Sequence, residues 1–203
     1  MQKIKPLLAV AVCVLTAFFV RAENAQENYE PHINLIKALG DSAISTLTSH
    51  EISEAERKAR FEEIFNKSFA VESIAQFVLG PYGRRATPQE KAEFLTLFKK
   101  TISDIYSARF KNYDKETFVV SHARSMGKRG VRVFSEIVRA GAPPVAVEWK
   151  VYEDKKGKLK IFDVIVERIS MSTTQKSEFA SIIQKNGGTV AGLNRALREK
   201  FKQ

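Results

Sequence analysis

The residue types that most often carry catalysis or hold metals are sparse and scattered in this sequence. The three histidines, His32, His50 and His122, have no spacing that would bring two of them to one metal ion. A single cysteine, Cys13, excludes a disulfide framework and a cysteine-based zinc site. No G-x-S-x-G turn and no glycine-rich phosphate loop is found either. We therefore expect no enzyme activity, no metal and no cofactor.

Asp163 and Glu167 are the one carboxylate pair whose spacing suggests a reaction. On one face of a strand, residues four apart have backbones about 13 Å apart. That separation is too long for the carboxylates of a retaining glycosidase and wide for an inverting one. We interpret both as salt-bridged or strand-edge carboxylates.

A cluster of hydroxyl side chains follows these carboxylates, at Ser170, Ser172, Thr173 and Thr174. It falls at an expected junction between a strand and a helix. Capping of that helix is the favoured explanation, and anion binding at the helix N-terminus is the alternative.

The chain is basic, with 33 Lys and Arg against 23 Asp and Glu and a formal charge of +10. Its cations gather in short turns, and solvated loops would explain them. A single-stranded nucleic-acid platform would interleave aromatic rings with these charges, which is not the case here, so we expect no nucleic-acid partner. Attraction to anionic headgroups fits better, at about 1 kcal/mol per positioned cation. Our candidates for headgroup or partner docking are Arg84, Arg85, Lys128 and Arg129.

The hydrophobic periodicity predicts which elements position these residues. Apolar spacing of three or four predicts helices over 32–49, 53–69 and 74–79, then a long helix from a capping box at Thr87 to about Lys111. The period then changes to two, which predicts an antiparallel meander of about four strands, the last over 159–169. Helices over 174–185 and from Thr189 close the chain. The fold class is α+β, with the C-terminal helices packed on one sheet face around an apolar pocket.

The apolar stripe of the long helix is unusually wide. Phe98, Ile102 and Tyr106 repeat every four residues and share one side of that helix. Val78 precedes a Gly-Pro helix stop, and Ile165 lies on the last long strand. Such a stripe packs a core in most proteins, but it could instead line a slot for acyl chains.

Residues 1–22 have the features of a secretory signal peptide. Lys3 and Lys5 precede an uncharged apolar run, and Val20-Arg21-Ala22 resembles a cleavage site. The run from Leu7 to Val20 is too short to span a bilayer as a mature helix, although an uncleaved anchor is the alternative. We expect export to the periplasm, cleavage after Ala22 and a single mature domain over 23–203.

Two sequence blocks carry a resemblance to a known family. The first is residues 77–82 (FVLGPY) with 86–89 (ATPQ), followed by Phe98 and Tyr106. The second is residues 162–171 (FDVIVERISM). Together with residues 177–179 and 192–197 they resemble the MlaC family of periplasmic lipid carriers, also called toluene-tolerance proteins. The likeness covers about residues 32–200, and Arg168 departs from it where the family usually has glycine.

The resemblance implies a monomeric shuttle that carries a phospholipid or related lipid as cargo. Its implied partners are an outer-membrane lipoprotein–porin complex and an inner-membrane ABC transporter with an MCE-domain subunit. Lipid transport between them would maintain the asymmetry of the outer membrane. Our candidates for the contacts with the acyl chains are Val78, Phe98, Ile102, Tyr106 and Ile165. Residues 177–188 resemble the hopanoid-biosynthesis-associated branch, so a non-carrying periplasmic adaptor in a hopanoid or other lipid pathway is the alternative.

Overall fold

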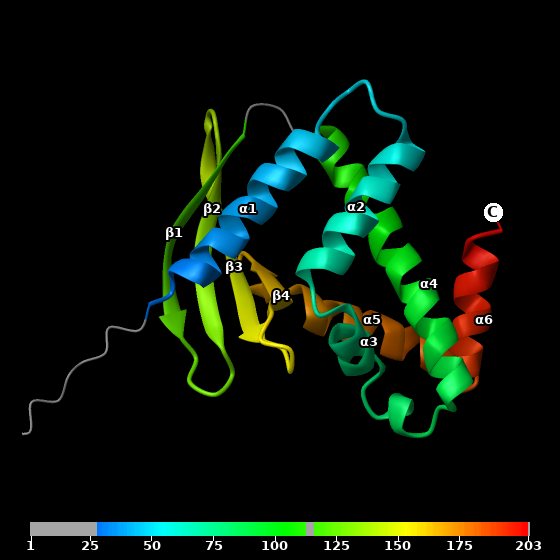
Figure 1. The fold of residues 1–203 in the computed structure, drawn as a ribbon. Coiled ribbons are helices and arrows are strands. Elements are labelled where there is room, and N and C mark those ends of the chain that lie inside the picture. The colour runs from blue at the N-terminus through cyan, green and yellow to red at the C-terminus, as the bar shows by residue number, and fades with distance from the viewer. Residues whose placement is uncertain (1–27, 113–115, 203) are drawn as a thin grey trace, which may run out of the picture.

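The computed structural model describes residues 28–112 and 116–202, so the expected signal peptide over 1–22 lies outside the described residues. Helices come first, a sheet follows, and two helices end the chain (Figure 1). The first group is α1 (Glu30–Leu47), α2 (Glu54–Ser68), α3 (Val71–Leu79), the short 3-10 helix η1 (Tyr82–Arg84), α4 (Pro88–Ser107) and the 3-10 helix η2 (Ala108–Asn112). The last two are α5 (Met171–Lys185) and α6 (Val190–Lys200). The expected α+β class is confirmed.

The sheet is an antiparallel meander in the order β1-β2-β3-β4-β5. Its strands are β1 (Thr117–Ser125), β2 (Val131–Arg139), β3 (Ala142–Glu153), β4 (Leu159–Val166) and β5 (Ile169–Ser170). The sequence predicted one strand over 159–169, but the chain turns back after Val166 and pairs Val166 with Ile169. Glu167 and Arg168 form the turn with φ of 48° and 68°. Positive φ at both central residues is what a tight two-residue hairpin requires, and it adds the fifth strand.

Helix starts follow the expected capping chemistry with two corrections. At α4, Thr87 and Glu90 form the full reciprocal box. At α2, the Ser53 side chain accepts from the Glu56 amide, but the Glu56 carboxylate pairs with Arg60 rather than returning to Ser53. Helix α5 begins at Met171, ahead of the expected start at Thr174, because the Ser170 hydroxyl accepts from the Thr173 amide. The hydroxyl cluster therefore does cap this helix.

Two apolar cores hold the molecule together. The helical core is formed by side chains from all five helices from α2 through α6. Its largest fully buried side chains include Phe94, Phe98, Ile183 and Leu193. The sheet core packs α1 against the strands, with Ile36, Leu39, Val131, Val133, Val151 and Ile161 buried. In Figure 1, α1 crosses the face of the sheet while α4 and α6 lie on the far side of α2. Among the described residues, no helix is both long and apolar enough to cross a bilayer.

Candidate functional site

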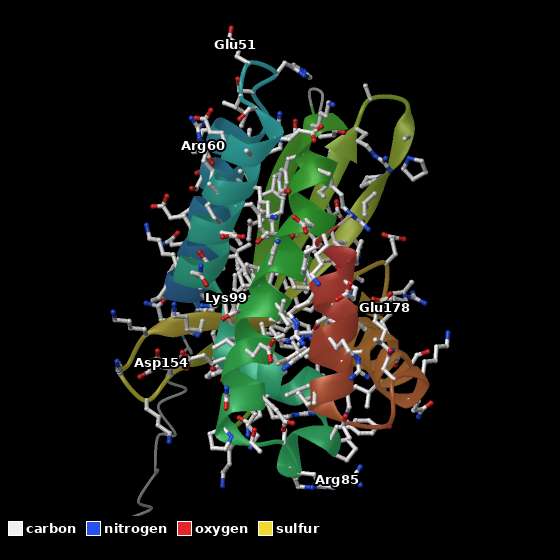
Figure 2. The ribbon with its side chains drawn as sticks, turned by 90° about the vertical axis from the view of Figure 1, so that its right-hand side faces the viewer. Glu51, Arg60, Arg85, Lys99, Asp154 and Glu178 are labelled. Atoms are coloured by element: carbon white, nitrogen blue, oxygen red, sulfur yellow. The ribbon has the colours of Figure 1, made fainter. Side chains whose placement is uncertain are left out.

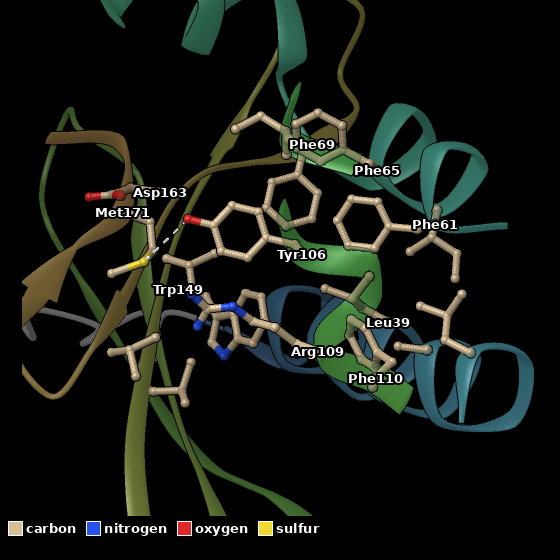
Figure 3. Close-up of a pocket in the computed structure, with 18 of the residues that line it drawn as sticks. Leu39, Phe61, Phe65, Phe69, Tyr106, Arg109, Phe110, Trp149, Asp163 and Met171 are labelled. Atoms are coloured by element: carbon tan, nitrogen blue, oxygen red, sulfur yellow. Dashed lines mark hydrogen bonds between the residues drawn. The ribbon is translucent and has the colours of Figure 1, made fainter. Parts of the chain in front are cut away.

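A cavity of about 440 Å³ lies between the sheet and helices α1, α2 and α4. This volume falls within the range of about 300–1,000 Å³ typical of ligand pockets. Nearly all of the lining is aliphatic or aromatic (Figure 3). From the helices it includes Leu39, Ala43, Ile44, Leu47, Phe61, Ile64, Phe65, Ile74, Phe98, Ile102 and Tyr106. From the strands it includes Phe118, Ile137, Val147, Trp149, Phe162, Val164 and Val166.

One wall of the cavity is the α4 stripe predicted from sequence. Phe98, Ile102 and Tyr106 all line the cavity. Their exposure rises along the helix: Phe98 is 1% exposed, Ile102 is 6% exposed, and Tyr106 is half-buried. The next lining residue, Arg109, is exposed. From this gradient we infer that the cavity is closed near Phe98 and opens near the start of η2.

Val78 and Ile165, the other two sequence candidates, are not among the residues that line the cavity. Val78 is buried in the helical core instead. On β4 the lining residues are Phe162, Asp163, Val164 and Val166, and the alternation of side chains turns Ile165 to the opposite face from Val164 and Val166. An irregularity in the β3–β4 register, where Lys150 pairs with Asp163 but Val151 with Ile161, places an extra residue at Phe162. The strand is apolar on both faces, so its sequence does not reveal which face looks inward.

The contributions of α1 and α2 were missed as site residues, although their apolar stripes were visible in the sequence. A glycine adds to this wall. A Cβ placed on Gly40 would lie 2.3 Å from the Phe118 ring, so only glycine lets α1 approach β1 this closely. Gly40 and Phe118 both line the cavity as a result. A lone glycine inside a helical stripe was the signal that could have indicated this contact.

Tyr106 places a phenol group in the part of the cavity wall that α4 forms. Its hydroxyl donates to Met171 Sδ at 3.7 Å, drawn as a dashed line in Figure 3. Burial raises the pKa of the Tyr106 phenol, while the nearby charge of Arg109 acts in the opposite direction. The Arg109 guanidinium carbon lies 5.1 Å from the centroid of the Tyr106 ring, within cation–π range.

Among the described residues, Asp163 is the only carboxylate in the lining, and its oxygens already have partners. It forms an ion pair with Lys150 at 2.9 Å and accepts from the Ser170 hydroxyl at 2.8 Å and the Ser172 amide at 3.0 Å. Burial would raise the pKa of Asp163, but these hydrogen bonds outweigh it and hold the pKa below its ordinary value. Glu167 accepts from the Ala146 amide. The sequence interpretation of Asp163 and Glu167 as structural carboxylates is confirmed.

The four cations predicted to dock headgroups or partners are all exposed, on two separate turns. Arg84 and Arg85 lie at η1, and Lys128 and Arg129 lie in the β1–β2 turn. Figure 1 draws both at the lower end of the view, the β1–β2 turn below the sheet and η1 below the helices, apart from each other. Figure 2 shows Arg85 at the end of the molecule opposite Glu51. The two pairs therefore form two sites rather than one, and their docking role stays a prediction.

A family model described as MlaC protein matches residues 37–199. The chain belongs to the MlaC family. Among its MlaC relatives is the intermembrane phospholipid transport system binding protein MlaC of Haemophilus influenzae, 20% identical over 192 residues that cover 91% of this chain and 89% of that protein. The toluene tolerance protein ttg2D of Pseudomonas putida is 24% identical over 106 residues, covering 52% of this chain and 49% of that protein.

A solved structure of an MlaC-like fold is also similar to this chain. It is a phospholipid-binding protein from Ralstonia solanacearum in complex with a phospholipid. The TM-score is 0.72 at 22% identity, over 82% of this chain and 94% of that one. The two chains share a fold, and the resemblance found in the sequence is confirmed at the level of the family.

Proposed function

We propose that this protein is a periplasmic phospholipid carrier that holds acyl chains in the cavity between sheet and helices. It shuttles its cargo between an outer-membrane lipoprotein–porin complex and an inner-membrane MCE-type ABC transporter, and so maintains outer-membrane asymmetry. The observation that carries the proposal is the apolar cavity of about 440 Å³ in a chain of the MlaC family. The names of the Haemophilus and Ralstonia proteins support phospholipid as the cargo class.

The task of such a carrier is solvation rather than catalysis. Each methylene group exposed to water costs about 0.8 kcal/mol, so two chains of about 16 carbons cost on the order of 20 kcal/mol. An apolar cavity removes this cost without any reactive group. Asp163, the one carboxylate that the described residues contribute to the lining, is held by Lys150 and by the start of α5. We therefore propose a binding role and no reaction on the lipid.

Native mass spectrometry of the protein purified from the periplasm tests this proposal. We expect one phospholipid adduct per monomer, on a chain that begins at Glu23. A chain that carries no lipid, even after incubation with phosphatidylglycerol vesicles, would contradict the carrier and favour a non-carrying adaptor. An adduct with the mass of a hopanoid would replace phospholipid as the cargo, and a retained N-terminal segment would contradict cleavage after Ala22.

A further inference from the structure

Arg109 is the one lysine or arginine among the described residues that line the cavity. It lies in η2, three residues beyond Tyr106 and on the same side of the chain, and it is exposed. None of the ion pairs in the described part of the chain includes it. A positive charge that forms no ion pair within the described residues therefore lies at the mouth of a largely apolar cavity.

The orientation of Arg109 is set by its neighbour on α4. Figure 3 shows its side chain extending from the end of that helix toward the side of the cavity where Trp149 lies, with the guanidinium beside the Tyr106 ring. A guanidinium carries five N–H donors, and cation–π contact with one ring leaves donors available along its N–H edge. The parallel N–H groups of that edge form the fork that can bind two oxygens of one phosphate.

The other charged lining residue does not neutralise this arginine. The Asp163 carboxylate accepts from Lys150, Ser170 and the Ser172 amide. These three donors occupy it at the junction of β4 and α5. An anion at the mouth would therefore meet a free donor edge without displacing an existing ion pair.

We infer that Arg109 binds the phosphate of the lipid headgroup at the cavity mouth, and this inference rests on the proposed function. The acyl chains then extend past Tyr106 toward Ile102 and Phe98, along the gradient of burial on α4. The phosphate stays at the exposed end, where water reaches its remaining oxygens. The cavity selects for apolar chains, and Arg109 selects for lipids that carry an anionic phosphate.

A competition between two lipids with identical acyl chains tests Arg109. Lipid-loaded protein is incubated with mixed vesicles of phosphatidylglycerol and diacylglycerol, and native mass spectrometry gives the ratio of the two adducts. We expect the wild type to prefer phosphatidylglycerol and Arg109→Gln to reduce that preference about 10-fold or more, the usual effect of losing a charged hydrogen bond. Arg109→Lys keeps the charge but loses the fork, so its preference should fall between the two.

Arg195→Gln is the matched control, because Arg195 is also exposed but lies on α6, outside the cavity lining. It should keep the wild-type preference. An unchanged preference in both Arg109 variants, or an equal loss in Arg195→Gln, would overturn the inference. Free inorganic phosphate should not displace the lipid, and displacement would instead indicate an anion site independent of the headgroup. If the wild type takes up neither lipid, the proposed function itself fails.

Discussion

Ile102 lies where the helical core and the cavity meet. Its side chain is 6% exposed, belongs to the helical core and also lines the cavity. Ile183 on α5 is equally apolar and fully buried at 0%, but it does not line the cavity. The same substitution at the two positions therefore separates cavity lining from solid core.

We expect Ile102→Asp to fold and to lose its lipid, because water can enter the cavity and hydrate the new carboxylate once the lipid is absent. Ile183→Asp should unfold, since an unpaired charge would be buried among packed side chains. Circular dichroism melting and native mass spectrometry measure the two effects. Wholesale unfolding of Ile102→Asp would make position 102 ordinary core, and full lipid retention would remove it from the binding surface.

Asp163 makes a pH-dependent contribution to stability. Its pKa is lowered in the folded protein, so its contribution is fully present above the ordinary value of 3.8 and is lost as the pH falls through the folded pKa. Asp163→Asn should destabilise the protein by about 1–3 kcal/mol at neutral pH, because it removes a charged acceptor that three donors share. Urea unfolding at a series of pH values should show the gap between wild type and variant closing in acid. A gap that stays constant would contradict this role.

At the scale of the elements, the β4–β5 turn holds residues with a Cβ in the left-handed region. Arg168 adopts φ of 68°, in the left-handed region that costs a residue with a Cβ about 1–2 kcal/mol. Arg168→Gly should remove that strain, and the greater freedom of glycine in the unfolded chain offsets part of the gain. We expect a net stabilisation of about 0.5–1 kcal/mol in urea unfolding.

Arg168→Ala is the control for the turn, because it removes the charge and keeps the Cβ. It should give no such gain. If alanine and glycine stabilised the protein equally, the effect would come from the charge of Arg168 and not from its backbone conformation.

The sequence predicted the structure best where the hydrophobic periodicity and the capping residues indicate the same element. The box at Thr87 fixed the start of α4, and the spacing of Phe98, Ile102 and Tyr106 predicted one cavity wall. Two features of the site could not be predicted from the sequence. Both faces of β4 carry apolar side chains, so the sequence does not show which face lines the cavity. We therefore chose Ile165 as a candidate, whereas Val164 lines the cavity. Core and cavity are also indistinguishable in sequence, since both require apolar side chains. Arg109 was not singled out from the sequence, although its charge follows directly after the α4 stripe.

For the whole molecule, the two cationic turns can be tested separately because one follows α3 and the other joins β1 to β2. Replacing Arg84 and Arg85, or Lys128 and Arg129, by serine should slow association with anionic vesicles and leave bound lipid unchanged. The effect should be largest at low salt, where charges on the surface are least screened. Surface plasmon resonance at several salt concentrations measures it. Association that is independent of salt would contradict a docking role for either pair.

The cavity is bounded by two separately packed cores, one within the helices and one between α1 and the sheet. Phe65 and Phe98 come from the first core and Leu39 from the second, and all three line the cavity. A small sliding of one core against the other would change the width of the cavity. If the cavity holds acyl chains as proposed, this movement would let it accept chains of different length and unsaturation, so that one protein could serve a membrane whose lipid composition changes.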